Sequence, residues 1–111
     1  MVILTVGALC RSEYEIYAHR AVAAKAGMGA EDIEALATGA EPKGLDAAEL
    51  TAHRFVRAVV ADHRVPPALF AEAQQVFGHK GLVEMLHLAG LYLTVSVMLN
   101  AFEVPVPEAS A

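Results

Sequence analysis

Residues 88–99 read LAGLYLTVSVML, and this run constrains the fold more than any other part of the chain. Its side chains are apolar or small on every face of a helix. Such a helix is buried in a core, a membrane or an oligomer. The run is 12 residues long, whereas a membrane span needs ~20, and extending it backwards meets His87 and Glu84. We therefore predict a central helix shared between the subunits of a homo-oligomer, and no membrane span.

Size and charge narrow the possible classes of function. A length of 111 residues predicts one domain over 1–111. Apolar residues make up 56% and charged residues 19%, which excludes a disordered chain. Eight Lys and Arg against 13 Asp and Glu give a net charge of −5. A nucleic-acid partner is disfavoured, because phosphate binding needs a basic face.

The single cysteine, Cys10, excludes an internal disulfide, a CxxC pair and a cysteine-based zinc site within one chain. The sequence shows no charged segment followed by an apolar run and a cleavage site. We therefore expect a cytoplasmic protein.

Capping residues, glycines and prolines divide the chain into helices. Residues 2–11 are short and apolar, and fit a strand or a helix by themselves. The expected helices that follow span residues 13–26, 30–38, 47–62, 67–77 and 79–102. Ser12 with Glu15, and Asp46 with Glu49, have the spacing of a capping box. Because the alternation typical of half-buried strands is missing, we predict an all-α fold of about six helices with a long apolar C-terminal helix. Residues 104–107 are expected to be extended, and 108–111 frayed.

The densest group of polar residues is SEYEIYAHR, residues 12–20. On a helix, Glu15 and His19 are four residues apart and face the same way. Ser12 lies on that side, and Tyr14 and Tyr17 flank it. A carboxylate beside an imidazole fixes its tautomer and raises its basicity, so His19 is a candidate general acid or base with Glu15 as its partner. Ser12, Tyr14 and Tyr17 are the candidate substrate-binding residues.

A purely structural interpretation of these residues stays open. Glu15 can serve only to complete the capping box with Ser12, and His19 can be half of a surface pair.

The remaining candidates give weaker signals. His53, beside Arg54, is expected to be solvated, and His87 is expected to be a satisfied core residue. Cys10 either has a lowered pKa near a helix N-terminus or is buried and inert. No spacing typical of a metal site occurs, so we predict no metal and no cofactor.

Two long segments resemble the carboxymuconolactone decarboxylase family, which includes the AhpD-like alkylhydroperoxidases. One is VILTVGALCRSEYEIYAHRAVAAKAGMGAEDIEAL, and the other is VPPALFAEAQQVFGHKGLVEMLHLAGLYLTVSVMLNAFEVPVPE. Together they cover nearly the whole chain. The resemblance implies an all-helical AhpD-like domain that assembles as trimers or hexamers. Family members usually have a helical region before the first segment, so it also implies that this chain lacks that region.

The resemblance separates two branches of the family. The peroxidase branch carries Glu-x11-Cys-x2-Cys-x3-His. Its His matches His19, its cysteines fall on Ser12 and Glu15, and its Glu falls one residue before Met1. Peroxidase or disulfide-reductase activity is therefore disfavoured. The decarboxylase-like branch carries an acidic residue and a His in this helix, as Glu15 and His19 do here. The reaction it implies is cofactor-free loss of carbon dioxide from a carboxylated lactone.

Two main hypotheses follow, from different classes. The first is an oligomeric lyase that acts on a small carboxylated lactone or related acid through Glu15 and His19. The second is a ligand-binding or structural oligomer without turnover. A peroxidase acting through Cys10 is a third, disfavoured alternative.

Overall fold

The apolar N-terminal segment forms helix α1, Val2–Leu9, in a computed structural model that describes residues 1–107. The sequence alone did not decide whether this segment forms a strand or a helix. The helix forms because other helices surround it: α1 packs against α2, α3, α4 and α5. Leu4 and Val6 are almost fully buried, so α1 is the centre of the chain's own core.

Helices α2, Glu13–Lys25, and α3, Ala30–Thr38, form a hairpin beside α1. The turn between them contains Gly27 at φ 93°, and Gly39 ends α3 at φ 83°, which are backbone angles that favour glycine. Ile33 and Leu36 of α3 pack on Leu4 of α1. The predicted bounds of both helices agree with the structure to within a residue or so.

Helix α4, Ala47–Arg57, begins with the predicted capping box. The Glu49 amide donates to Asp46 Oδ1 at 2.8 Å, and the Asp46 amide donates to Glu49 Oε1 at 3.2 Å. The helix continues as a π-helical segment, η1, Ala58–Asp62, which ends at His63 with φ 62°. The combined range 47–62 was predicted from the sequence, but the π-helical turn was not.

Helix α5, Pro67–Ala101, covers the two helices expected over 67–77 and 79–102. Its backbone leaves the helical region at Gly78, with φ 70° and ψ 170°, so its two parts meet at a kink where the break was predicted. The described residues contain the five helices α1 to α5, and counting the two parts of α5 separately gives the six that were expected.

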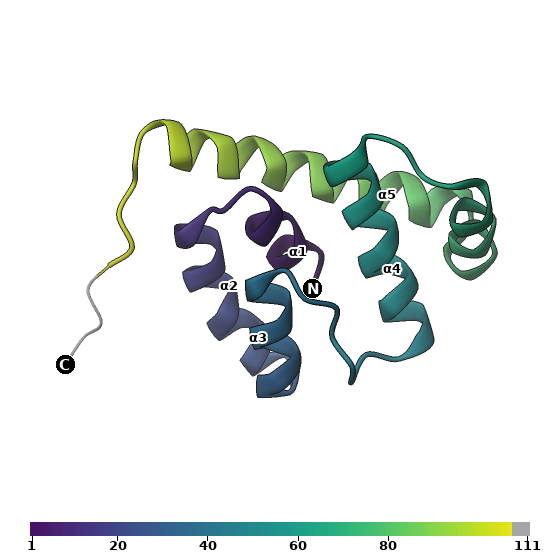
Figure 1. The fold of residues 1–111 in the computed structure, drawn as a ribbon, viewed down its shortest axis with the longest axis horizontal. Coiled ribbons are helices and arrows are strands. Elements are labelled where there is room, and N and C mark those ends of the chain that lie inside the picture. The colour runs from purple at the N-terminus through teal and green to yellow at the C-terminus, as the bar shows by residue number, and fades with distance from the viewer. Residues whose placement is uncertain (108–111) are drawn as a thin grey trace.

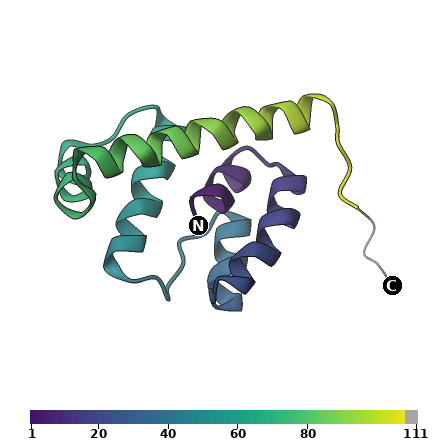
Figure 2. The same cartoon turned by 180° about the vertical axis from the view of Figure 1, so that it is seen from behind.

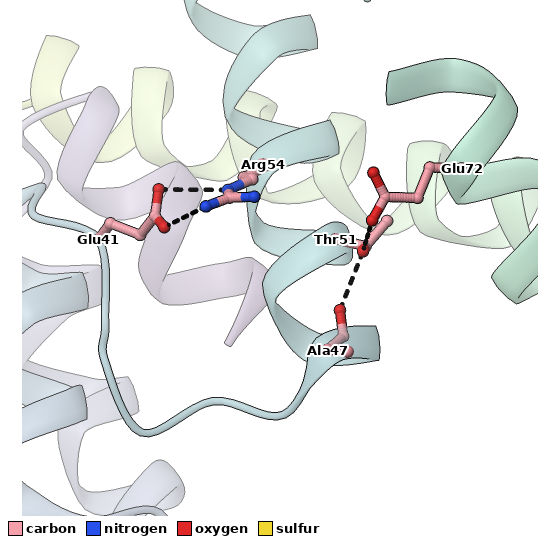
Figure 3. Close-up of polar contacts among 5 residues, drawn as sticks. All are labelled: Glu41, Ala47, Thr51, Arg54 and Glu72. Carbon is pink, nitrogen blue, oxygen red and sulfur yellow. Dashed lines mark hydrogen bonds and ion pairs between the residues drawn. The ribbon is translucent and has the colours of Figure 1, made fainter. Parts of the chain in front are cut away.

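The C-terminal part of α5 lies across α1 and the end of α4, and α1 to α4 all lie on one side of it (Figures 1 and 2). Val6, Val56 and Ala89 form the cluster in which α1, α4 and α5 meet. The N-terminal part of α5 is joined to α4 by Thr51, whose single hydroxyl proton is shared between the Ala47 carbonyl, at 2.9 Å from Oγ, and Glu72 Oε1, at 3.0 Å (Figure 3).

The structure confirms the all-α prediction, since residues 1–107 contain helices and no strand. By length and composition alone, α5 is apolar enough to cross a membrane, and only 17% of its most apolar window is buried. Residues 104–107 have no regular secondary structure. The fraying expected for 108–111 falls outside the described residues.

Candidate functional site

The site begins at the turn between α1 and α2. Arg11 has φ 53°, and Ser12 occupies the N-cap position of α2 with its side chain fully buried. The predicted capping box of Ser12 with Glu15 is wrong, because no side-chain hydrogen bond caps this helix. The Ser12 amide instead donates to the Gly7 carbonyl at 2.9 Å, so the donor that Glu15 would have bound is already used.

The carboxylate of Glu15 is turned into the protein toward His19. Glu15 is 5% exposed, and its Oε2 lies 3.1 Å from Nε2 of His19. The two atoms are within ion-pair distance, but their alignment does not make a hydrogen bond. Gly7 lies next to Glu15, and a Cβ at Gly7 would be in van der Waals contact with Glu15 Cβ at 3.4 Å. The predicted pairing of Glu15 with His19 is therefore present, with the carboxylate in the interior.

Helix α5 supplies a residue that the sequence analysis missed. The ring of Tyr92 meets the ring of His19 edge to face, with centroids 5.4 Å apart and an interplanar angle of 89°. One turn later Ser96 is fully buried, and after another turn Asn100 donates to the Cys10 carbonyl at 2.7 Å. The spacing of four between these polar residues, within an otherwise apolar helix, was the sequence signal for this face.

Several buried polar atoms around the site have no hydrogen-bond partner among the described residues. They are Ser12 Oγ, Glu15 Oε2, His19 Nδ1 and Ser96 Oγ. Buried polar groups are nearly always hydrogen-bonded, so four such atoms on α2 and the facing side of α5 are unusual. This part of the interior therefore contains polar atoms that the chain's own groups do not all supply with hydrogen bonds.

His19 also lines a cavity of about 120 Å³ between α1 and α2. The other lining residues are all apolar: Met1, Ile3, Leu4, Val22, Ala23, Ala26 and Met28. The imidazole is thus the polar group of an apolar cavity, and the carboxylate of Glu15 stands behind it. A small molecule bound there would have its apolar part in contact with the aliphatic side chains and one polar group near His19.

The other predicted site residues do not share this cavity. Ser12 and Tyr14 belong to the wall of a separate groove of about 370 Å³, formed with the end of α5 and residues 103–105. Tyr17 is 46% exposed and lies outside both spaces. The structure therefore brings Glu15 and His19 together with Tyr92, and places Ser12, Tyr14 and Tyr17 elsewhere around α2.

The prediction that His53 is solvated is wrong. His53 is 3% exposed, and its Nδ1 lies 3.0 Å from Thr5 Oγ on α1. Burial lowers the pKa of His53, with smaller opposing and supporting effects from Glu41, Arg57 and Arg54. The position next to Arg54 was misleading, because α4 buries one face and Arg54 lies on the other, where it pairs with Glu41 (Figure 3).

The lowered pKa considered for Cys10 is not found. The residue is partly buried, and burial raises the pKa of its thiol. His87, expected in a core, is instead exposed. Within residues 1–107, no group of three or more His, Cys, Asp or Glu side chains is arranged to hold a metal ion.

Comparisons with protein-family models, with curated proteins and with solved structures found no match to this chain. What the site can do is therefore argued from its geometry. An imidazole at the edge of an apolar cavity, with a buried carboxylate at 3.1 Å, is an arrangement suited to accepting or donating a proton.

Proposed function

We propose that this chain is a carboxymuconolactone decarboxylase-like protein that catalyses cofactor-free decarboxylation of a small carboxylated lactone or related acid. The observation that carries the proposal is the pair of Glu15 and His19, with Nε2 and Oε2 3.1 Å apart, at the wall of an apolar cavity. The sequence resemblance to the decarboxylase-like branch, which has an acidic residue and a His in this helix, supports the same reaction.

His19 has the central role in this proposal. Loss of carbon dioxide leaves the bonding electron pair on the substrate as an enolate, which must then receive a proton. Because Nε2 of His19 faces Glu15, the proposal assigns the proton transfer to Nδ1, which is buried and has no hydrogen-bond partner among the described residues. Protonated His19 delivers that proton, and its positive charge stabilises the developing enolate.

Glu15 lies beside one edge of the imidazole, while Tyr92 packs against the side of the ring. The aliphatic side chains of the cavity would surround the apolar part of the substrate. Arg20 follows His19 in the chain but does not serve this cavity, since its guanidinium pairs with Glu34 of α3. The charge of the enolate is therefore met by His19 and not by arginine.

The test is carbon dioxide release from carboxymuconolactone by the purified protein, compared with His19→Gln. The matched control is His79→Gln, which changes an exposed histidine on α5. We expect the His19 variant to lose ~10²–10⁴ of the rate, the usual contribution of a general acid or base, and the His79 variant to keep it. Equal rates in all three proteins would remove His19 from the mechanism.

The second candidate, binding without turnover, is favoured by one observation. Residues other than His19 that line the cavity are apolar, so the described residues place no second charged side chain in its wall. A protein of this kind binds small apolar acids and converts none of them. Multiple turnovers on any lactone would exclude it, whereas saturable binding with no product would exclude the decarboxylase.

Peroxidase activity through Cys10 stays disfavoured, because the nucleophile is the thiolate and burial raises the pKa of this thiol. If the protein turned over peroxide measurably and Cys10→Ser abolished that turnover, peroxidase activity would become the favoured function. We keep the cytoplasmic location, the lack of a cofactor and the assembly as trimers or hexamers as parts of the proposal; of these two assemblies, only the hexamer can contain a two-fold contact between subunits. The exposed apolar surface of α5 supports assembly.

A further inference from the structure

The side of α5 that faces away from the other helices carries a continuous apolar stripe. We call this the outer stripe, and it consists of Leu86, Gly90, Leu91, Thr94, Val97 and Met98, which share one face of the helix. Leu91, Val97 and Met98 are 57%, 56% and 55% exposed. No Asp, Glu, Lys or Arg occurs between Glu84 and Glu103. Both views of the fold show α1 to α4 on the opposite side of this helix (Figures 1 and 2).

The outer stripe borders a groove of about 290 Å³ between α5 and η1. Its lining is apolar apart from the exposed His63 at the end of η1, and comprises Val59, Val60, His63, Leu86, Ala89, Gly90 and Leu93. A Cβ at Gly90 would meet nothing within 4 Å, so the helix has an open, shallow point there. The same face therefore offers protruding apolar side chains and a largely apolar hollow beside them.

A lipid bilayer does not fit this surface. The inner side of α5 packs against α4, whose Arg54 and Arg57 are exposed, and a spanning α5 would carry these charges into hydrocarbon. A helix lying in the membrane surface usually has many Lys and Arg on its polar face. Between residues 67 and 101 the only basic residue is Lys80, and the chain has a net charge of −5.

We propose that the outer stripe is the interface with a second copy of this chain, related by a two-fold axis near Gly90 and Thr94. A two-fold contact places the same patch on both subunits, so a patch with both protrusions and a hollow is complementary to itself. The small side chains at positions 90 and 94 allow the two helices to approach most closely there. This inference does not depend on the chemistry proposed for His19.

The charges at the two ends of the stripe set the direction of the partner helix. An antiparallel partner brings Lys80 of one subunit near Glu103 of the other, whereas a parallel partner brings Glu103 near its own copy. Lys80 is highly exposed and lies 4.0 Å from Glu84, and Glu103 is exposed. The antiparallel arrangement is therefore the one that avoids repulsion.

The size of the surface agrees with this assignment. The part of α5 after Gly78 is about 34 Å long, and the outer half of a helix of that length presents on the order of 500 Å². The flanking residues of η1 add to it. Together they approach the ~800 Å² per subunit that a stable interface of standard size buries.

Cross-linking tests the position of the axis. In a Cys10→Ser background, Thr94→Cys should form an intermolecular disulfide on mild oxidation, because residues next to a two-fold axis meet their own copies. Thr38→Cys, an exposed site on α3, is the matched control and should stay unlinked. Equal cross-linking of both variants, or none in either, would overturn the proposal.

Light scattering tests the surface itself. The purified chain should contain an even number of subunits, and Val97→Lys should weaken self-association at least about tenfold while circular dichroism stays unchanged. Val76→Lys, on the first part of α5 and 46% exposed, should leave association unaffected. A purified chain that is a monomer, whether or not it binds phosphatidylcholine vesicles, would overturn the proposal, and so would a trimer. Equal self-association of the two variants would also overturn it.

Discussion

Thr5 Oγ on α1 lies 3.0 Å from Nδ1 of His53 on α4, in the interior of the chain. The Thr5 hydroxyl donates its one proton to the Met1 carbonyl, so it accepts a hydrogen bond from Nδ1. This arrangement assigns the proton of the neutral imidazole to Nδ1 and leaves Nε2 buried and without a partner among the described residues. Protonating His53 would place an unpaired charge at Nε2.

The first prediction is a loss of stability in mild acid. Burial lowers the pKa of His53 in the folded chain below its ordinary value of 6.5. The unfolded chain therefore binds a proton first as the pH falls through 6.5, and the free energy of unfolding decreases until the folded pKa is reached. His53→Asn keeps a donor near Thr5 but does not titrate, so it should flatten this part of the curve. Urea denaturation of both proteins over a pH series measures the free energy of unfolding. Parallel pH dependences of the parent protein and of His53→Asn would contradict the prediction.

The second prediction concerns the kink of α5. Gly78 has φ 70° and ψ 170°, a region that glycine occupies almost alone. A Cβ there meets nothing within 4 Å, so the strain of Gly78→Ala would come from the backbone and not from a clash. We expect a destabilisation of ~1–3 kcal/mol. Thermal unfolding measures it, with Gly29→Ser as control, since Gly29 has φ −65° at an N-cap and should tolerate serine. An unchanged Tm in the Gly78 variant would show that alanine adopts the kinked backbone at position 78 without strain.

Local patterns predicted the helices well, and groups outside each pattern decided where it failed. Asp46 with Glu49 and Ser12 with Glu15 have the same spacing, yet only the first pair forms a capping box. The Ser12 amide donates to the Gly7 carbonyl, a bond that closes the C-terminal turn of α1, where Arg11 has φ 53°. Because the residues that end α1 precede the four residues of the motif, the spacing of Ser12 and Glu15 alone was insufficient.

The candidate site also combines contacts that a local sequence pattern predicts with contacts that only the folded chain creates. The i,i+4 spacing of Glu15 and His19 predicted their pairing, because both residues lie on one helix. Tyr92 reaches His19 from 73 positions further along the chain, and only the packing of α5 brings them together. His53 was misjudged for a related reason: its burial comes from Thr5 on α1, whereas its sequence neighbour Arg54 lies on the solvent side.

The third prediction concerns the loop before α4. The Gly44 amide donates to Asp32 Oδ1 at 2.9 Å, and a Cβ at Gly44 would collide with the same carboxylate. Gly44→Ala should displace Asp32 and lose this hydrogen bond, at a cost of ~1 kcal/mol. In an Asp32→Ala background, where both the collision and the bond are gone, the same change should cost much less. Urea denaturation of the four proteins measures the difference, and additive effects would contradict it.

The last prediction separates the structural role of Glu15 and His19 from their chemical role. The Glu15 side chain is 7% exposed, and its Oε2 lies 3.1 Å from Nε2 of His19. His19→Ala leaves this buried carboxylate without the imidazole beside it, and a buried polar group that loses its partner costs ~1–3 kcal/mol. Because His19 is itself 19% exposed, some water reaches the pair, and we expect a value at the lower end of this range. Glu15→Gln in the His19→Ala background removes the buried charge and should recover part of the lost stability, so the two changes should be non-additive by ~0.5–3 kcal/mol. The cycle is measured by urea denaturation at neutral pH. Full additivity at neutral pH would show that the two side chains are neighbours without an energetic link, and would remove the support that this pair gives to the proposed proton transfer.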